Sequence, residues 1–151
     1  MIKWIISLLK LVKIFLRIKK KEEEIHILSN AIQTPDGTIL KSYHTHDYKE
    51  HVDGITGETY MVDGGNSYFR YNRNKVRAKS LSVTTEDPHE LIREHFTWGS
   101  FGKNGDEELH WVVLKDMETD HINAILRTQK RLAKHLVKVF EEELEWRDNN
   151  D

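Results

Sequence analysis

Residues 25–62 read IHILSNAIQTPDGTILKSYHTHDYKEHVDGITGETYMV, and this stretch decides the fold class. Short runs rich in Ile, Leu, Val, Tyr and Thr alternate with clusters of Pro, Asp and Gly, which favour tight turns. The pattern predicts three strands, over residues 25–33, 38–48 and 58–62. Because strands joined by such short turns pair most simply with their neighbours, we expect an antiparallel sheet.

Shorter elements follow downstream. Breaks at residues 63–66 and 72–74 separate two further predicted strands, 67–71 and 75–85. Asp87-Pro88-His89-Glu90 is typical of a helix start, with an acid at the N-cap and proline at the first helical position. This helix is predicted to end near His95 or Phe96. A glycine-rich loop over 98–106 and a strand over 109–114 come next.

The C-terminal part is predicted to be helical. Thr119 or Asp120 caps a helix to about residue 128, and apolar spacing predicts another over 131–147. The spacing runs almost through residues 128–132, so one long bent helix also fits. The fold class is therefore α+β: a small antiparallel β-sheet followed by two C-terminal helices, in one ligand-binding domain of residues 25–151.

Residues 1–21 (MIKWIISLLKLVKIFLRIKKK) differ from the rest in charge. They hold seven of the 23 Lys and Arg residues and none of the 25 Asp and Glu residues. The bases recur at three- and four-residue steps, which places most of them on one helical face. Four charges interrupt the apolar run, whereas a bilayer span needs about 20 apolar residues. No secretory cleavage site is present. Residues 1–24 are predicted to be an amphipathic basic helix and a charged linker.

Three placements of this helix remain open. It suits the headgroup plane of an anionic inner leaflet, which would make the membrane surface a partner. It also suits packing on its own domain or on a sister subunit. A disordered tail is the third alternative.

Charge and cysteine content exclude some functions. Residues 22–151 hold all 25 acids, and the chain has a net charge of −2. Duplex DNA binding relies on many contacts between Lys or Arg and phosphate, so we expect no duplex DNA partner. The chain has no cysteine, which excludes disulfides and thiolate metal sites and fits a reducing compartment.

The best candidate ligand segment interleaves aromatic rings with guanidinium groups: Tyr68, Phe69, Arg70, Tyr71, Arg73 and Arg77. On a strand, even-numbered residues share one face and odd-numbered residues the other. Either face supplies a ring for stacking and a cation for phosphate. Gly64 and Gly65 let backbone approach a ligand closely. An edge strand with solvated arginines is the alternative.

Two further segments are candidates. Phe101, Lys103 and Asn104 lie among glycines that leave backbone amides exposed, and the alternative is a plain connection. This loop lacks the Walker spacing. Arg131 sits where the helix pair turns, within reach of phosphate across a subunit boundary. An ordinary surface cation near a helix end is the alternative there.

Histidines suggest a metal-dependent phosphodiesterase as a further alternative. His44 and His46 would share a strand face, and two imidazoles plus a carboxylate of the segment 44–53 would suit Zn²⁺. However, Asp47 follows His46 directly, so the HxHxDH spacing of metallohydrolases is missing. We expect structural histidines, with no metal, no cofactor and no catalytic set.

Several motifs occur in a recognisable order: Ser42…His46-Asp47-Tyr48, then Val62-Asp63-Gly64-Gly65 with Tyr68 and Arg70 (VDGGxxYxR), then Phe101-Gly102-Lys103-Asn104-Gly105, Trp111-Val112-Val113-Leu114-Lys115-Asp116-Met117, His121-Ile122 and Phe140…Glu143-Leu144-Glu145-Trp146-Arg147. Over residues 30–147 this order resembles a group of small bacteriophage proteins, the first-described type of anti-Thoeris sponge. Such proteins have an N-terminal antiparallel sheet and two C-terminal helices, and they form oligomers. They bind, without cleaving it, the cyclic ADP-ribose isomer made by bacterial TIR-domain enzymes, and some also bind cyclic oligonucleotides.

The resemblance implies a homo-oligomeric phage anti-defence protein that sequesters this signal in the host bacterial cytoplasm. The expected ligand contacts are Tyr68, Phe69, Arg70, Phe101, Lys103 and Asn104, with Arg73, Arg77 and Arg131 as secondary charge contacts. Many relatives carry cysteine pairs where this chain has residues 34–37 and 53–54, so a metal knuckle is absent. The basic N-terminal segment is not part of the pattern either. A membrane-peripheral adaptor that binds proteins is therefore the alternative function.

Overall fold

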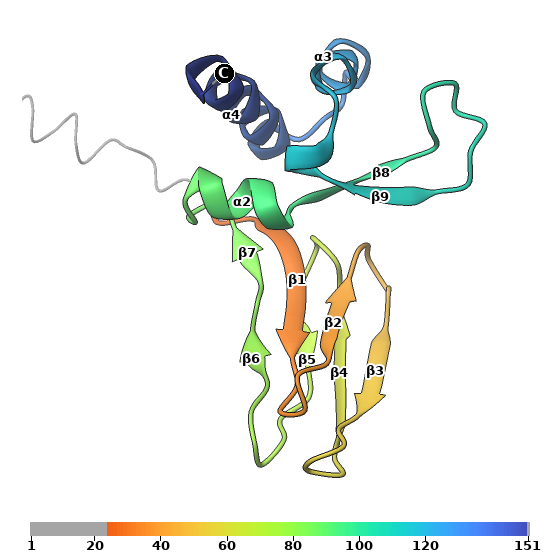
Figure 1. The fold of residues 1–151 in the computed structure, drawn as a ribbon, viewed down its shortest axis with the longest axis vertical. Helices are drawn as coiled ribbons and strands as arrows, with labels where there is room; N and C mark the ends of the chain where they lie inside the picture. Colours follow the sequence, from red (N-terminus) through yellow and green to blue (C-terminus); the bar gives the residue numbers. More distant parts are fainter. Residues whose placement is uncertain (1–23, 151) are drawn as a thin grey trace, which may run out of the picture.

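The computed structural model describes residues 24–150, which form two parts arranged along the long axis (Figure 1). One part, the strand body, consists of short β-strands. The other, the helical layer, consists of helices and a two-stranded hairpin. The predicted α+β class, with antiparallel sheets and C-terminal helices, is confirmed. The predicted helix over residues 1–21 lies outside the described residues.

Two small antiparallel sheets make up the strand body. The first consists of β2 (Ile39–Ser42), β1 (Ile27–Gln33) and β6 (Lys79–Ser80), and β7 (Val83–Thr84) also pairs with β1. The second consists of β3 (Lys49–Val52), β4 (Thr59–Asp63) and β5 (Arg70–Tyr71). Both sheets contribute to a small core of Ile32, Leu40, Tyr60 and Val62.

Carboxylates join the two turns at the end of the strand body away from the helices (Figure 1). Asp36 Oδ2 accepts a hydrogen bond from the Gly54 amide at 2.8 Å and lies 2.7 Å from His51 Nε2. In return, Asp53 Oδ2 accepts a hydrogen bond from the Asp36 amide at 2.8 Å. The Gly54 amide, His51 and Thr34 together hold the pKa of Asp36 far below its usual range. The two turns therefore support each other through charge-assisted hydrogen bonds.

Some strand boundaries were predicted wrongly. The strand predicted over residues 38–48 ends at Ser42, because the chain folds back on Asp47. The Asp47 carboxylate accepts a hydrogen bond from the Tyr43 amide at 2.8 Å. The backbone carbonyl of Asp47 accepts one from the Ser42 hydroxyl at 2.7 Å. Separate short strands replace the predicted strands 67–71 and 75–85. Local hydrogen bonds by Asp, Asn and Ser compete with strand pairing here.

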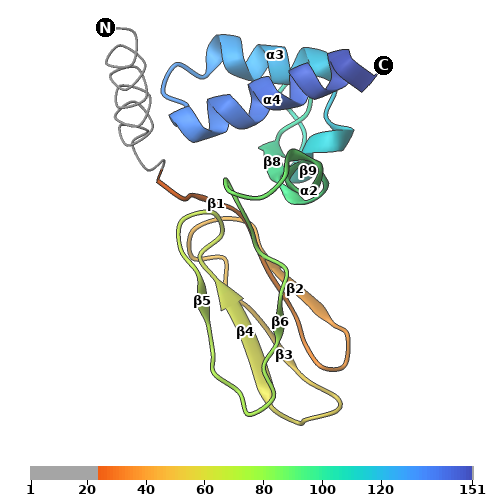
Figure 2. The ribbon, with the colours of Figure 1, turned by 90° about the vertical axis from the view of Figure 1, so that its left-hand side faces the viewer.

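The helical layer contains α2 (His89–His95), β8 (Thr97–Ser100), β9 (His110–Val113), the 3-10 turn η1 (Leu114–Asp116), α3 (Thr119–Thr128) and α4 (Lys134–Asn150). Figure 2 shows α3 and α4 side by side on the far side of α2 from the strands. Their shared core reaches down to β1 and β7 and comprises Leu28, Val83, Ile92, Phe96, Leu114, Met117, Ile122, Ile125, Val139 and Phe140. No helix within residues 24–150 has both the length and the apolar character needed to cross a bilayer.

The prediction of two separate C-terminal helices is confirmed, but several details differ. Residues 97–100, predicted largely as loop, form β8 and pair with β9. Helix α2 begins one residue later than predicted, and no side chain caps it. The Asp87 carboxylate instead accepts a hydrogen bond from the Thr84 amide at 2.7 Å. Helix α3 likewise has Glu118 at its N-cap, rather than Thr119 or Asp120, and no capping side chain.

A buried carboxylate ties α2 to α4. Glu143 is fully buried, and its oxygens accept hydrogen bonds at 2.9 Å from both Arg93 and Arg147. His89 Nε2 lies 2.9 Å from the same carboxylate. Burial alone would raise the pKa of Glu143, but these hydrogen bonds outweigh it and hold the pKa below its usual value. The Arg93 guanidinium also stacks 3.5 Å from the ring centre of Trp146.

Candidate functional site

The VDGG motif forms the turn between β4 and β5, where both glycines are geometrically required. Gly64 has φ of +112° and Gly65 has φ of +52°, in the region that favours glycine. A Cβ on Gly64 would overlap the Tyr68 carbonyl, and one on Gly65 would overlap the backbone of His44. The close approach expected for these glycines is therefore made to the protein's own backbone. It clamps the turn after β2 against the turn before β5.

Strand β5 and the two residues before it distribute the predicted ligand residues over two faces. The Tyr68 hydroxyl donates to Asp63 Oδ2 at 3.1 Å, and Arg70 Nη1 lies 3.7 Å from the same oxygen. Burial and the nearby Asp63 raise the pKa of Tyr68. Phe69 and Tyr71 line a pocket instead. Tyr68 and Arg70 are thus engaged with Asp63, which is almost completely buried.

Phe69, Arg73 and Arg77 meet at an open pocket of about 500 Å³, which we call the arginine pocket. Its other lining residues are Ile32, Tyr71, Asn72, Ala78, Ser80 and Ser82. The lining offers two guanidiniums, two aromatic rings and three hydroxyls, and none of the described residues that form it is acidic. Such a set can hold an anionic ligand that carries a flat ring.

Asn72 holds the arginine pocket in shape. Its Oδ1 accepts a hydrogen bond from the Met61 amide at 3.0 Å, and its Nδ2 donates to the Thr59 carbonyl. Asn74 Nδ2 donates to the same carbonyl at 2.9 Å. The segment that carries Arg73 is therefore attached to β4 by side chains on both sides of it.

The other predicted residues do not line the arginine pocket. Phe101, Lys103 and Asn104 lie in the loop between β8 and β9, which projects from the helical layer (Figure 1). Arg131 lies in the connection between α3 and α4. Within one copy of the chain, the predicted set is therefore divided among four places: the arginine pocket, the surroundings of Asp63, the β8–β9 loop and the α3–α4 connection.

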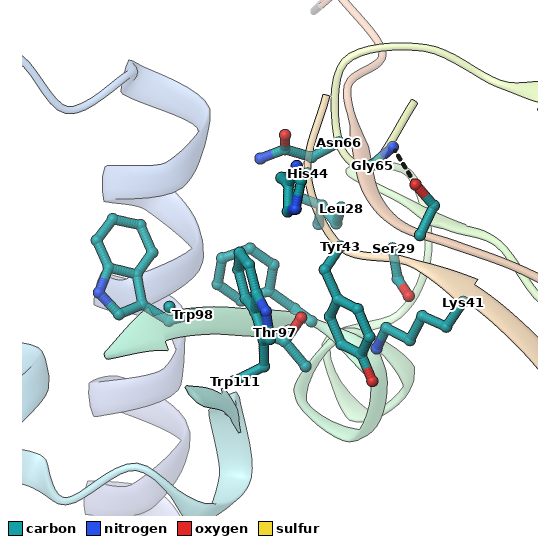
Figure 3. A pocket seen from close by; sticks show the side chains of 13 residues that line it. Leu28, Ser29, Lys41, Tyr43, His44, Gly65, Asn66, Thr97, Trp98 and Trp111 are labelled. Carbon is teal, nitrogen blue, oxygen red and sulfur yellow. Dashed lines mark hydrogen bonds between the residues drawn. The ribbon is translucent and has the colours of Figure 1, made fainter. Parts of the chain in front are cut away.

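A second pocket, of about 250 Å³, lies where the strand body meets the β8–β9 hairpin (Figure 3). The Tyr43 ring stacks on Trp111 with centroids 5.2 Å apart, and His44 lies 6.2 Å from the same indole. Trp98 and Lys41 lie on opposite sides in Figure 3. We call this site the tryptophan pocket; Leu28, Ser29, Ser42, Gly65, Asn66, Phe96, Thr97 and Gly99 complete it.

Among the described residues, Lys41 is the only Lys or Arg that lines the tryptophan pocket. Its Nζ donates to the His95 carbonyl at 2.7 Å and lies 5.3 Å from the Tyr43 ring centre. Burial lowers the pKa of Lys41 to about 8. Sequence reasoning missed this site because its residues come from separate segments of the chain. The two-residue spacing between Lys41 in β2 and Tyr43 just after it is a local signal of this site.

The histidines proposed as metal ligands do not converge. His44 and His46 lie in the turn after β2, not on a strand, and His46 has φ of +63°. The Asp53 carboxylate accepts hydrogen bonds from the amides of Asp36, Ile55 and Thr56 in another turn. Across residues 24–150, His, Asp and Glu side chains form no group of three or more that could hold a metal ion.

Comparisons with protein-family models, with curated proteins and with solved structures find no match to this chain. The two pockets and the charges around them are therefore the basis for proposing a function.

Proposed function

We propose that this chain is a phage anti-defence protein that sequesters a cyclic ADP-ribose-type immune signal without cleaving it. The observation that best supports this proposal is the convergence of Phe69, Arg73 and Arg77 on the arginine pocket. All three are ligand residues that the sequence predicts. Two guanidiniums suit the two phosphates of such a ligand, and the aromatic rings suit its base.

The size and polarity of the arginine pocket also support this ligand class. Its volume of about 500 Å³ lies within the range of about 300–1,000 Å³ that is usual for small-molecule sites. A sponge acts by mass action, so it must bind tightly enough to hold free signal below the threshold of its effector. Submicromolar affinity corresponds to more than about 8 kcal/mol of binding free energy.

The tryptophan pocket is the competing location within the same protein. It offers stacking surfaces, but its single ammonium already donates to the His95 carbonyl. A ligand with two phosphates therefore finds more charge in the arginine pocket. Variants of the two pockets distinguish these locations.

The test is calorimetric titration of the full chain with the cyclic ADP-ribose isomer made by a TIR-domain enzyme. We expect submicromolar binding, and intact ligand after the protein is heated and the supernatant is chromatographed. Arg73→Gln with Arg77→Gln should weaken binding at least tenfold, or about 1.4 kcal/mol. Trp111→Ala is the control and should change it little. Absence of binding, or release of a cleaved product, contradicts the sponge.

A second candidate function is a membrane-peripheral adaptor, favoured by the basic amphipathic sequence of residues 1–21. Deleting residues 1–24 should abolish the function of an adaptor and leave ligand binding by a sponge unchanged. Homo-oligomerisation belongs to the sponge proposal, and light scattering of the purified chain tests it.

A further inference from the structure

The end of the helical layer where α3 leads into α4 carries a cluster of exposed cations. We call this cluster the basic turn; it consists of Arg127, Lys130, Arg131 and Lys134. Residues 121–140 contain no Asp or Glu, although the chain as a whole has more acids than bases. Arg131, which lines neither the arginine pocket nor the tryptophan pocket, is a member of this cluster.

Three cations elsewhere in the helical layer have acidic partners. Arg93 and Arg147 bind Glu143, and Lys115 Nζ lies 2.6 Å from Glu94. In contrast, no member of the basic turn forms an ion pair with another residue of the described range 24–150. The first turn of α4 also lacks an acid, although the positive end of the helix dipole lies there. Only Arg127, in the last turn of α3, is favourably placed relative to a helix dipole. The other three bases have neither an acidic partner within residues 24–150 nor a favourable helix end, which points to an anionic partner outside the chain.

The described part of the chain starts beside the basic turn. The imidazoles of His26 and His135 stack with centroids 3.8 Å apart and planes within 10°. Glu24 and Lys134 line the pocket around this stack. Figure 2 shows the start of β1 and the α3–α4 connection on the same side of the molecule. Glu24, the first described residue, therefore lies near the basic turn.

We propose that this end of the molecule docks on an anionic lipid surface, and that the basic turn contacts lipid headgroups beside residues 1–21. Lipid suits the sequence of residues 1–21 better than nucleic acid does, because apolar residues such as Trp4, Leu8 and Phe15 alternate with the bases. Each base near an anionic surface strengthens binding by about fivefold. The strand body, which carries the arginine pocket, extends away from the helical layer (Figure 1).

The experiment is co-sedimentation of the full chain with vesicles of equal parts phosphatidylglycerol and phosphatidylcholine. The variant carries Arg127→Gln, Lys130→Gln and Arg131→Gln together. A matched control carries Lys49→Gln, Lys75→Gln and Lys79→Gln, which remove the same charge from exposed positions on the strand body. We expect the basic-turn variant to bind about 100-fold more weakly than the parent chain, and the control to bind within about threefold of it.

Three outcomes overturn the proposal: no binding of the parent chain to anionic vesicles, equal weakening in both variants, or parent-like binding by the basic-turn variant. Loss of binding to polyuridylate, with vesicle binding unchanged, would assign the basic turn to nucleic acid instead and also overturns it. Thermal melting confirms that both variants fold. Ligand titration without vesicles tests the sponge separately, so either proposal can fail alone.

Discussion

Within residues 24–150, the core of the helical layer comprises ten buried apolar side chains, two of them supplied by β1 and β7, whereas the separate core of the strand body comprises four. The strand body compensates with polar contacts between segments that are distant in sequence. Asn30, which is almost fully buried, donates hydrogen bonds to the carbonyls of Asp63 and Tyr68. Asp36 and Asp53 join the turns at its far end.

The stability of the helical layer and that of the strand body therefore depend on different interactions. Burial of apolar area is non-directional and tolerates exchange between side chains of similar volume. Hydrogen bonds between turns require particular atoms at particular positions. We therefore expect truncation of apolar side chains to damage the helical layer most, and changes of backbone or polar atoms to damage the strand body most.

The largest effect expected is from Phe140→Ala in the helical layer. Phe140 is fully buried and meets Phe96 and Trp98 edge-on, with centroids 5.8 and 5.3 Å away. The cavity left behind should lower the free energy of unfolding by about 4 kcal/mol. Urea denaturation measures this loss. Leu91→Ala, at an exposed position of α2, should lower it by less than about 1 kcal/mol. Equal losses would refute the importance of this core.

Glu143→Gln tests the ionic link within the same layer. Removing the charge leaves Arg93 and Arg147 without their buried counterion and should lower stability by about 3 kcal/mol at neutral pH. Because folding lowers the pKa of Glu143, the stabilisation is present above its unfolded value of 4.5 and is lost as pH falls through the folded value.

Urea titrations at several pH values check this dependence. The difference between the parent chain and Glu143→Gln should shrink as the pH falls below 4.5. Glu142→Gln, on the same helix with a partly exposed side chain, is the control and should show a much smaller difference. A difference that does not change with pH would argue against an ionised Glu143.

Gly65→Ala tests a backbone contact of the strand body. Its positive φ and the overlap with the His44 backbone together should lower stability by about 2 kcal/mol. Gly57→Ala is matched to it, since Gly57 has φ of +70° but no atom within 4 Å of the added Cβ. That control isolates the cost of backbone conformation, and calorimetric melting of both variants gives the difference. Equal melting temperatures would show that the clamp is unimportant.

Asp36→Asn should have the smallest effect, since the polar cluster lies at the exposed end of the strand body. The variant should melt slightly below the parent chain at neutral pH. Folding lowers the pKa of Asp36, so its contribution is present above the usual 3.8 and fades on further acidification. Melting curves at neutral and acidic pH measure this change. A variant that melts at the parent temperature at neutral pH would contradict the role of the turn cluster.

Local patterns were sufficient for part of the fold. The turn residues around Asp36 and Asp53 and the helical spacing of 119–128 predicted elements that the structure contains, because such preferences act within a few residues. They failed at β8, where Gly99 and Ser100 suggested a loop. Pairing with Trp111 and His110 stabilises a strand there, and that partner is distant in sequence.

For the candidate sites too, local patterns predicted some features and missed others. The predicted alternation agrees with the structure for Phe69 and Tyr71, which line the arginine pocket, and for Tyr68 and Arg70, which contact Asp63. It fails for Asn72, which was predicted on the face of Tyr68 and Arg70 but lines the arginine pocket. No local rule could bring Arg77 to Phe69, or Lys41 to Trp111, since chain folding over many residues places them together. The sequence alone thus determined the α+β class, the charge division at residue 21 and the arginine-aromatic segment. Only the tertiary structure decided which of those side chains share a pocket, because convergence depends on contacts between distant segments.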